Sequence, residues 1–252
     1  MRRFNRNLMA CMACVMAMVG FTNAAQAIAP LNVPPGTYEY KTVIHESGKE
    51  HARLYVTFRT KGDLTHVKEE RKAVSGNGSD VYELTLNHKT GQLLKWTQTV
   101  TKDGQKTITQ MEETKTHLIA TTTYSNKKKK KVERIERPKG PYTVVPLVKF
   151  FIASEIGKGR TKGSFSLAVF AEGSLQEIGL DFKKEGEKTV SMMGKKQTCT
   201  YATSGPTSFA VSLVIPRGDL CVSKEKRPVL LQAVSKPTRF SDVMSTTLVR
   251  RQ

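Results

Sequence analysis

The sequence contains few of the residues and motifs on which common catalytic and metal centres depend. Beyond residue 27 it has two cysteines, Cys199 and Cys221, and no C-x-x-C pair, so the spacing typical of a structural zinc site or a dithiol redox motif is missing. The G-x-S-x-G, H-E-x-x-H and Walker sequences are missing as well. We therefore expect a protein that is not an enzyme and that uses no cofactor and no metal ion.

Long apolar runs are also scarce. The longest run near the N-terminus covers residues 8–21, which is shorter than the about 20 residues that a membrane-spanning helix needs. Three arginines precede it, and Ala25-Gln26-Ala27 follows it as an A-x-A cleavage pattern. This order predicts a signal peptide over residues 1–27, cleaved after Ala27, and a mature chain in a bacterial periplasm. Lipidation at Cys11 is the alternative, but almost no hydrophobic region precedes that cysteine.

Acidic residues are too few to balance the basic ones. The chain has 41 lysines and arginines, 22 aspartates and glutamates, and a formal net charge of +19. Such a charge indicates anionic partners and says little about the fold. In a periplasm these partners would be lipid headgroups, other anionic envelope surfaces or an acidic protein. Nucleic acid is not expected there.

Five consecutive lysines stand out in this basic sequence. Asn126 precedes them and Val132 follows, which is typical of the tip of a hairpin. They form either a solvated loop or a contact with an anionic lipid or envelope surface, in which case each lysine could contribute about 1 kcal/mol. The residues are Lys127, Lys128, Lys129, Lys130 and Lys131.

Most of the remaining chain alternates between apolar and polar residues with a period of two. Leu54, Val56 and Phe58, for example, alternate with polar or less apolar neighbours, as in a half-buried strand. Turn sequences such as Lys61-Gly62-Asp63 recur about every 10 to 14 residues, as in an antiparallel meander. The pattern predicts an all-β-dominated fold, with one meander over residues 28–140 and a second over residues 141–252, joined in one continuous β domain.

One segment breaks the alternation. Residues 144–157 are apolar on almost every side, with Thr143 available as a cap, Pro146 in the first turn and Gly157 at the end. A helix that is apolar all round is buried. We therefore expect one buried helix at about 144–157, packed on the concave face of a curved antiparallel sheet or half-barrel.

In the second meander we expect a turn at residues 184–187 and a strand over residues 209–215, where apolar residues again alternate. The even number of cysteines beyond residue 27 predicts a disulfide between Cys199 and Cys221. In the chain-entropy account such a disulfide stabilises by roughly 3 kcal/mol.

Titratable side chains offer no clear catalytic or metal site. His45 and His51 flank one turn, where exposed polar residues are common. Glu69-Glu70 and Glu112-Glu113 are adjacent pairs on strands, so the two carboxyl groups of each pair point to opposite faces and cannot act together.

Large apolar side chains are the more promising feature. If the curved sheet does not close tightly on the helix, the gap is an apolar cavity. The same side chains would otherwise form a solid core. The candidate cavity residues are Trp96, Phe150, Phe151, Phe165, Phe182 and Phe209.

The second half also resembles an uncharacterised family of bacterial periplasmic proteins built as curved β half-barrels, loosely similar to the lipoprotein-carrier fold. The resemblance rests on the apolar helix at residues 146–156 and on the segments 175–178, 187–190, 194–199 and 227–231. Relatives of this family carry lipid or lipoprotein acyl chains. The family pattern offers no catalytic residues, and the lysine run departs from it.

We therefore expect an exported periplasmic protein that binds or carries a lipid or acyl chain in a β-lined cavity. Shielding each CH₂ group from water would contribute ~0.8 kcal/mol to binding. The alternative is an envelope interaction protein with a solid core, which binds an anionic surface or a protein partner through its basic face.

Overall fold

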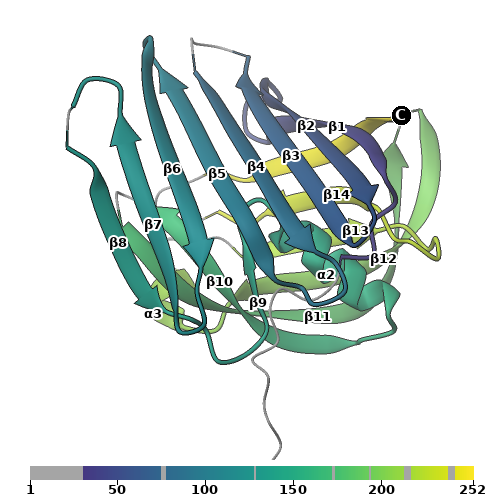
Figure 1. The fold of residues 1–252 in the computed structure, drawn as a ribbon. Helices are drawn as coiled ribbons and strands as arrows, with labels where there is room; N and C mark the ends of the chain where they lie inside the picture. The colour runs from purple at the N-terminus through teal and green to yellow at the C-terminus, as the bar shows by residue number, and fades with distance from the viewer. Residues whose placement is uncertain are drawn as a thin grey trace, which may run out of the picture.

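The computed structural model describes residues 31–74, 78–127, 129–171, 174–192, 194–212, 217–237 and 242–252. The predicted signal peptide, residues 1–27, lies outside this part of the chain. Within it, fifteen strands form one sheet that curls around a helix (Figure 1).

The strands are β1 (Gly36–Ile44), β2 (Glu50–Lys61), β3 (Leu64–Ala73), β4 (Ser79–Asn87), β5 (Leu93–Lys102), β6 (Gln105–Glu113), β7 (His117–Tyr124), β8 (Lys131–Glu136), β9 (Tyr142–Val144), β10 (Lys162–Ala171), β11 (Ser174–Met192), β12 (Lys195–Pro206), β13 (Gly218–Val222), β14 (Leu230–Ser235) and β15 (Met244–Arg251). The helices are α2 (Val148–Gly157) and the single turn α3 (Phe209–Ser212).

The strand order explains how the sheet curls. It runs β8-β7-β6-β5-β4-β3-β2-β1-β15-β14-β13-β12-β11-β10-β9. The strands β1–β8 form one layer in Figure 1, strands of the second half form the layer behind it, and α2 lies between the layers. The edge strand β8 also comes close to β11. The predicted all-β-dominated, curved antiparallel sheet with one buried helix is therefore confirmed.

The first and last strands form the seam between the two halves. β1 pairs antiparallel with β2 on one side and with β15 on the other. Thr37 and Gln252 exchange two backbone hydrogen bonds of 2.9 Å at the end of this seam. The alternating apolar residues of the strands face the interior. In β2, for example, Ala52, Leu54, Val56 and Phe58 are buried while their neighbours are partly exposed.

The helix α2 begins later than the sequence predicts. Thr143 is not its cap, because Tyr142–Val144 pair in parallel with β10 as β9. Leu147 is the N-cap residue, without a capping side-chain bond. The residue before a proline avoids the helical conformation, so Val145 and Pro146 separate the strand from the helix. Every residue from Phe150 to Ile156 is buried, as expected for a helix that is apolar all round.

Two predictions in the second meander are wrong. Residues 184–187 form no turn, because β11 runs through them with a bulge beside Gly186. Gly186 has a φ of 145°, which its missing Cβ permits, so the strand can bulge instead of reversing. The strand expected over residues 209–215 is replaced at residues 209–212 by α3, and residues 213–216 lie outside the described part of the chain. Pro206 cannot donate a ladder hydrogen bond, and β12 ends there.

The predicted disulfide is present. Cys199 of β12 and Cys221 of β13 are bonded, with their Cα atoms 5.5 Å apart. Both cysteines are buried. The bond therefore joins two neighbouring strands of the second half from inside the protein.

Candidate ligand-binding cavity

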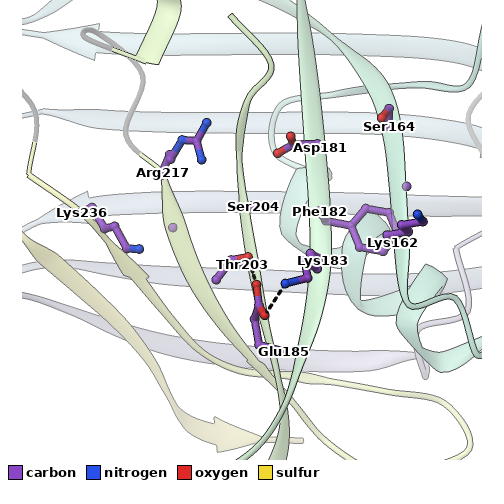
Figure 2. Close-up of a pocket in the computed structure, with 12 residues that line it drawn as sticks. Lys162, Ser164, Asp181, Phe182, Lys183, Glu185, Thr203, Ser204, Arg217 and Lys236 are labelled. Carbon is purple, nitrogen blue, oxygen red and sulfur yellow. Dashed lines mark hydrogen bonds and ion pairs between the residues drawn. The ribbon is translucent and has the colours of Figure 1, made fainter. Parts of the chain in front are cut away.

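A polar groove lies on strands β10–β13 (Figure 2). It has a volume of ≈ 830 Å³ and carries both signs of charge. Glu185 pairs with Lys183 at 2.9 Å and accepts a hydrogen bond of 3.0 Å from Thr203. Lys183 is two-thirds exposed. Because these charges already have partners and face water, the groove is a weak candidate for a specific ligand.

Two smaller cavities lie in the interior, between α2 and the concave face of the sheet. The larger has a volume of ≈ 340 Å³ and the smaller of ≈ 210 Å³. Small-molecule sites usually fall in the range of about 300–1,000 Å³. The larger cavity reaches this range alone, and the two cavities share the lining residues Arg71, Val148, Lys149 and Thr246.

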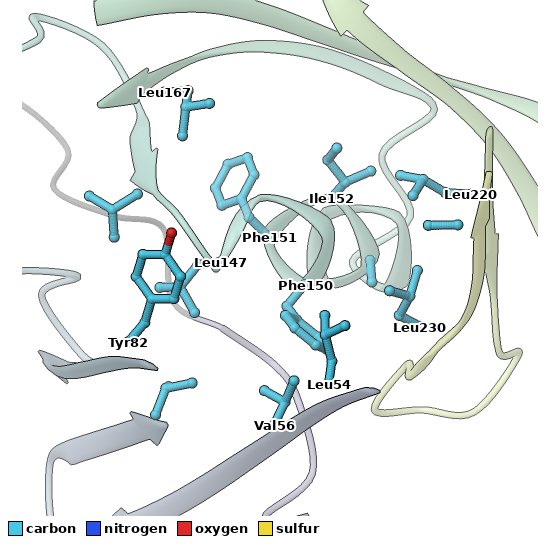
Figure 3. Packing of buried hydrophobic residues seen from close by; sticks show 14 of the residues in the cluster. Leu54, Val56, Tyr82, Leu147, Phe150, Phe151, Ile152, Leu167, Leu220 and Leu230 are labelled. Atoms are coloured by element: carbon cyan, nitrogen blue, oxygen red, sulfur yellow. The ribbon is translucent and has the colours of Figure 1, made fainter. Parts of the chain in front are cut away.

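The larger cavity has apolar walls and an open end. Ile152 of α2 lines it together with leucines from several strands, namely Leu167, Leu180 and Leu220. Figure 3 shows Ile152, Leu167 and Leu220 among the buried apolar side chains around α2. His51 and Arg71 also line it, and both are exposed. His51 lies near the start of β2 and Arg71 near the end of β3, so the cavity opens at this end of the curled sheet.

The smaller cavity lies beside the larger one, among residues of β1, β2 and α2. Tyr40, Leu54 and Val56 line it from the sheet, and Phe150 lines it from α2. The Tyr40 hydroxyl donates a hydrogen bond of 3.1 Å to the carbonyl of Leu230, so this polar group is satisfied. Burial raises the pKa of Tyr40 well above its ordinary value.

Three charged residues lie where the two cavities meet. Glu69 and Arg71 are two residues apart on β3 and therefore point to the same face of the sheet. Lys149 projects from α2. Glu69 is only 5 % exposed, while Lys149 is half-buried. We refer to Glu69, Arg71 and Lys149 as the charged cluster.

Burial dominates the titration of this cluster. It raises the pKa of the Glu69 carboxyl, although Arg71 and Lys149 partly oppose this effect. It lowers the pKa of the Lys149 ammonium, which Glu69 partly opposes. Among the described residues, none of the ion pairs within 4.0 Å includes a member of the cluster. The three charged groups therefore influence one another electrostatically over more than 4.0 Å, without direct ion pairs.

Of the six aromatic residues predicted to line a cavity, Phe150 lines the smaller one and Phe182 lines the polar groove of Figure 2. Phe151 and Phe165 pack together with ring centroids 4.7 Å apart, and Phe182 packs on Phe165 at 6.4 Å. Trp96 is buried and donates a hydrogen bond of 2.6 Å to the carbonyl of Val145. The side chain of Phe209 lies outside the described part of the structure.

The charged cluster was missed by sequence reasoning. The only signal is the alternation of β3, in which Glu69 and Arg71 share a face with Val67. A charged residue at such a position is normally assigned to the solvent side, because burying a charge is costly.

The lysine run lies in the hairpin between β7 and β8, as predicted. Lys127, Lys129, Lys130 and Lys131 are exposed, and Lys128 lies outside the described residues. The ammonium of Lys127 lies 4.9 Å from the ring centroid of Tyr124, and that of Lys131 pairs with Glu133 at 2.9 Å.

Neither a metal centre nor a membrane-spanning helix is found among the described residues. No group of three or more histidine, cysteine, aspartate or glutamate side chains there is placed to hold a metal ion. No helix in that part of the chain is both long and apolar enough to cross a membrane.

Comparison with known proteins gives information on the fold. No protein-family model and no curated protein sequence matches the chain. Among solved structures, it is similar to a β-barrel-like protein of the domain of unknown function DUF1849 from Brucella abortus. The identity is 10%, the TM-score is 0.57, and the match covers 90% of this chain and 99% of that one.

Two further structures match with lower scores. A hypothetical lipoprotein, YmcC, from Escherichia coli is 10% identical with a TM-score of 0.36, covering 99% of this chain and 98% of that one. A putative lipoprotein from Parabacteroides distasonis is 10% identical with a TM-score of 0.31, covering 89% and 99%. The similarity to the Brucella abortus protein shows that this chain has a β-barrel-like fold, as the resemblance in its sequence predicts.

Proposed function

We propose that this chain is an exported envelope protein that binds an apolar or amphiphilic ligand, such as a lipid or an acyl chain, between α2 and the sheet. Export is supported by the N-terminal sequence, in which a basic segment, an apolar run and Ala25-Gln26-Ala27 follow one another. The disulfide between Cys199 and Cys221 is consistent with an oxidising compartment.

The observation that carries the proposal is the larger cavity. Its lining surface is mostly apolar, with leucine, isoleucine and alanine side chains beside polar and charged groups such as Arg217 and Asp219, and its open end allows a chain to enter from solvent. Each CH₂ group that leaves water would contribute ~0.8 kcal/mol to binding. An apolar cavity joined to a few polar groups is the usual form of a small-molecule site.

A cavity-filling substitution tests this proposal. Ala233 of β14 lines the larger cavity, so Ala233→Phe would occupy its volume. Gln232→Phe adds the same ring at the next position, which points to the opposite face, and serves as the control. Binding of the fluorescent apolar probe N-phenyl-1-naphthylamine is measured for both variants.

We expect Ala233→Phe to weaken probe binding at least about tenfold, because the site loses the space for an apolar group. Gln232→Phe should bind as the wild type does. Lipid extraction and mass spectrometry of the protein purified from cells would also reveal a co-purified amphiphile. Probe binding that is equal in both variants, together with an empty purified protein, would contradict the proposal.

A second candidate function is supported by the exposed lysines of the β7–β8 hairpin. A cluster of four described lysines that face solvent can approach an anionic membrane surface. This surface would dock the protein on the envelope, either in addition to the cavity or in its place.

A further inference from the structure

The charged cluster divides the interior into two apolar spaces. Arg71 and Lys149 line both cavities, while Glu69 lines the smaller one. A ligand that occupies either cavity therefore lies against these two cationic side chains. The neighbouring lining residues Val148 and Leu54 are apolar and cannot neutralise them.

The charges of the cluster do not cancel. Three cations, Arg71, Lys149 and Arg217, and two acids, Glu69 and Asp219, line the two cavities, which leaves an excess of one positive charge when all five are ionised. Asp80 of β4 lies opposite Arg71 in the sheet but lines neither cavity. Lys149 is half-buried, whereas Arg71 is exposed at the open end of the larger cavity. A half-buried charge is costly unless a partner of opposite sign approaches it. Among the described residues, no carboxylate, that of Glu69 included, forms an ion pair within 4.0 Å with Arg71 or Lys149.

We infer that Arg71 and Lys149 recognise the carboxylate or phosphate head of a single-chain anionic amphiphile, whose tail occupies the apolar cavities. This inference rests on the proposed function and names the ligand class. Arginine suits such a head because its planar guanidinium can donate two parallel hydrogen bonds to carboxylate or phosphate oxygens. Volumes of ≈ 340 and ≈ 210 Å³ favour one tail over the two tails of a phospholipid.

The role of Glu69 follows from the same charges. It attracts the two cations from beyond ion-pair distance while the cavity is empty, and it opposes a ligand of its own sign. Replacing it with a neutral residue of the same shape should therefore strengthen anion binding, whereas removing a cation should weaken it. The two changes act in opposite directions, which a general loss of structure cannot imitate.

The experiment compares three ligands of equal tail length, namely dodecanoate, dodecyl phosphate and dodecan-1-ol, below their aggregation concentrations. The variants are Lys149→Met, Glu69→Gln and both changes together. Lys72→Met is the matched control, because Lys72 lies on β3 beside Arg71 but faces outward and pairs with Glu70 at 3.2 Å. Affinities are measured by displacement of N-phenyl-1-naphthylamine.

We expect the wild type to bind at least one of the two anions about tenfold more tightly than the alcohol, the size of one charge-assisted hydrogen bond. Lys149→Met should remove most of that preference, Glu69→Gln should increase it, and the double variant should return toward the wild type. Lys72→Met should change nothing. If Lys149→Met does not fold, Glu69→Gln still tests the inference, because this variant is expected to bind the anions more tightly than the wild type does.

The failures of the two proposals are distinguishable. A wild type that binds the alcohol as tightly as both anions, with no effect of any variant, would overturn the anion inference and leave the cavity proposal standing. A protein that binds none of the three ligands would overturn the proposed function itself.

Discussion

Glu113 and Arg137 form an ion pair of 2.7 Å whose side chains are only 3 % and 18 % exposed. The second carboxylate oxygen of Glu113 also accepts a hydrogen bond of 3.0 Å from the backbone amide of Leu93. The pair thus ties the end of β6 to β5 and to the segment that follows β8. Removing one partner of such a pair leaves an uncompensated buried charge, which destabilises the protein more than replacing both partners with apolar residues would.

We predict that Glu113→Ala lowers the free energy of unfolding by about 3–5 kcal/mol. Glu133→Ala is the control, since Glu133 pairs with Lys131 at the surface and exposed pairs contribute about 1 kcal/mol or less. Urea denaturation followed by circular dichroism measures both. Equal losses in the two variants would show that the buried pair has no special role.

The buried Glu69 predicts a pH dependence. Burial raises the pKa of its carboxyl above the ordinary value of 4.5. A carboxyl group with a raised folded-state pKa contributes fully to stability below its unfolded pKa, and this contribution is lost as the pH rises through the folded pKa. Lys149→Met removes a nearby cation and should make the ionised form still less favourable.

In the Lys149→Met background, we therefore expect Glu69→Gln to raise the free energy of unfolding by about 1–3 kcal/mol near pH 8. Below about pH 4 the carboxyl is protonated in both states, and the gain should disappear. Urea denaturation at both pH values measures the difference. A gain of the same size at both would rule out titration of Glu69 as its cause.

Adjacent glutamates show what the sequence reveals at the scale of residues. The alternation of strands predicts that Glu69 and Glu70 point to opposite faces, as do Glu112 and Glu113. In the structure Glu69 is 5 % exposed, whereas the Glu70 side chain is 30 % exposed. The alternation could not say which member of each pair lies inside, because both have the same side chain and only the tertiary partners differ.

At the scale of elements, α2 links the two layers of the sheet. Phe150 contacts Phe58 of β2 with ring centroids 5.0 Å apart and Tyr40 of β1 at 6.3 Å. On the other side, Phe151 contacts Phe165 of β10 at 4.7 Å. We predict that Phe150→Ala lowers the free energy of unfolding by about 3–5 kcal/mol, because it leaves a void that the rigid strands cannot fill. Leu94→Ala on β5 is the control, since Leu94 is 46 % exposed. Urea denaturation would contradict this prediction if both losses were small.

The turns of the first half were easier to predict than those of the second. Lys61-Gly62-Asp63 reverses the chain between β2 and β3 with Gly62 at a φ of 57°, which glycine adopts readily. Gly186 lies in a similar charged sequence, yet β11 continues through it. The difference comes from β12, which pairs with β11 on both sides of the bulge. Local sequence does not contain this long-range pairing.

At the scale of the molecule, the basic charge predicts binding to anionic membranes. Replacing the five lysines at 127–131 with serine should weaken binding to vesicles that contain phosphatidylglycerol by about 1 kcal/mol per lysine that contacts the surface. Sedimentation with vesicles at low and high salt measures this, because salt screens such attraction.

The control replaces five exposed lysines elsewhere, which lowers the net charge equally: Lys61, Lys95, Lys183, Lys195 and Lys196. If both sets of substitutions weakened vesicle binding equally, the hairpin would have no specific role in membrane binding.

The class of fold could be predicted from the sequence, but the order of its strands could not. Alternation and turn residues identify each strand separately, but they do not show which strands pair with one another in the sheet. The seam depends on contacts such as that between the hydroxyls of Thr42 and Thr246, 3.1 Å apart and separated by 204 residues. The curvature of the sheet was expected from the helix that is apolar all round, and the half-barrel also from the resemblance to a family. The cavities depend on how closely α2 approaches the sheet, which no local pattern determines.

Because β1 pairs with β15, the sheet cannot be completed before β15 has been synthesised. A chain that emerges from its N-terminal end displays an unpaired edge on β1 until residues 244–251 arrive. An open strand edge of this kind is a template for attachment to other chains. The strand β15, which follows the other strands of this sheet in the sequence, is thus the one that protects β1. A chain interrupted before β15 would retain an aggregation-prone edge at the centre of its sheet.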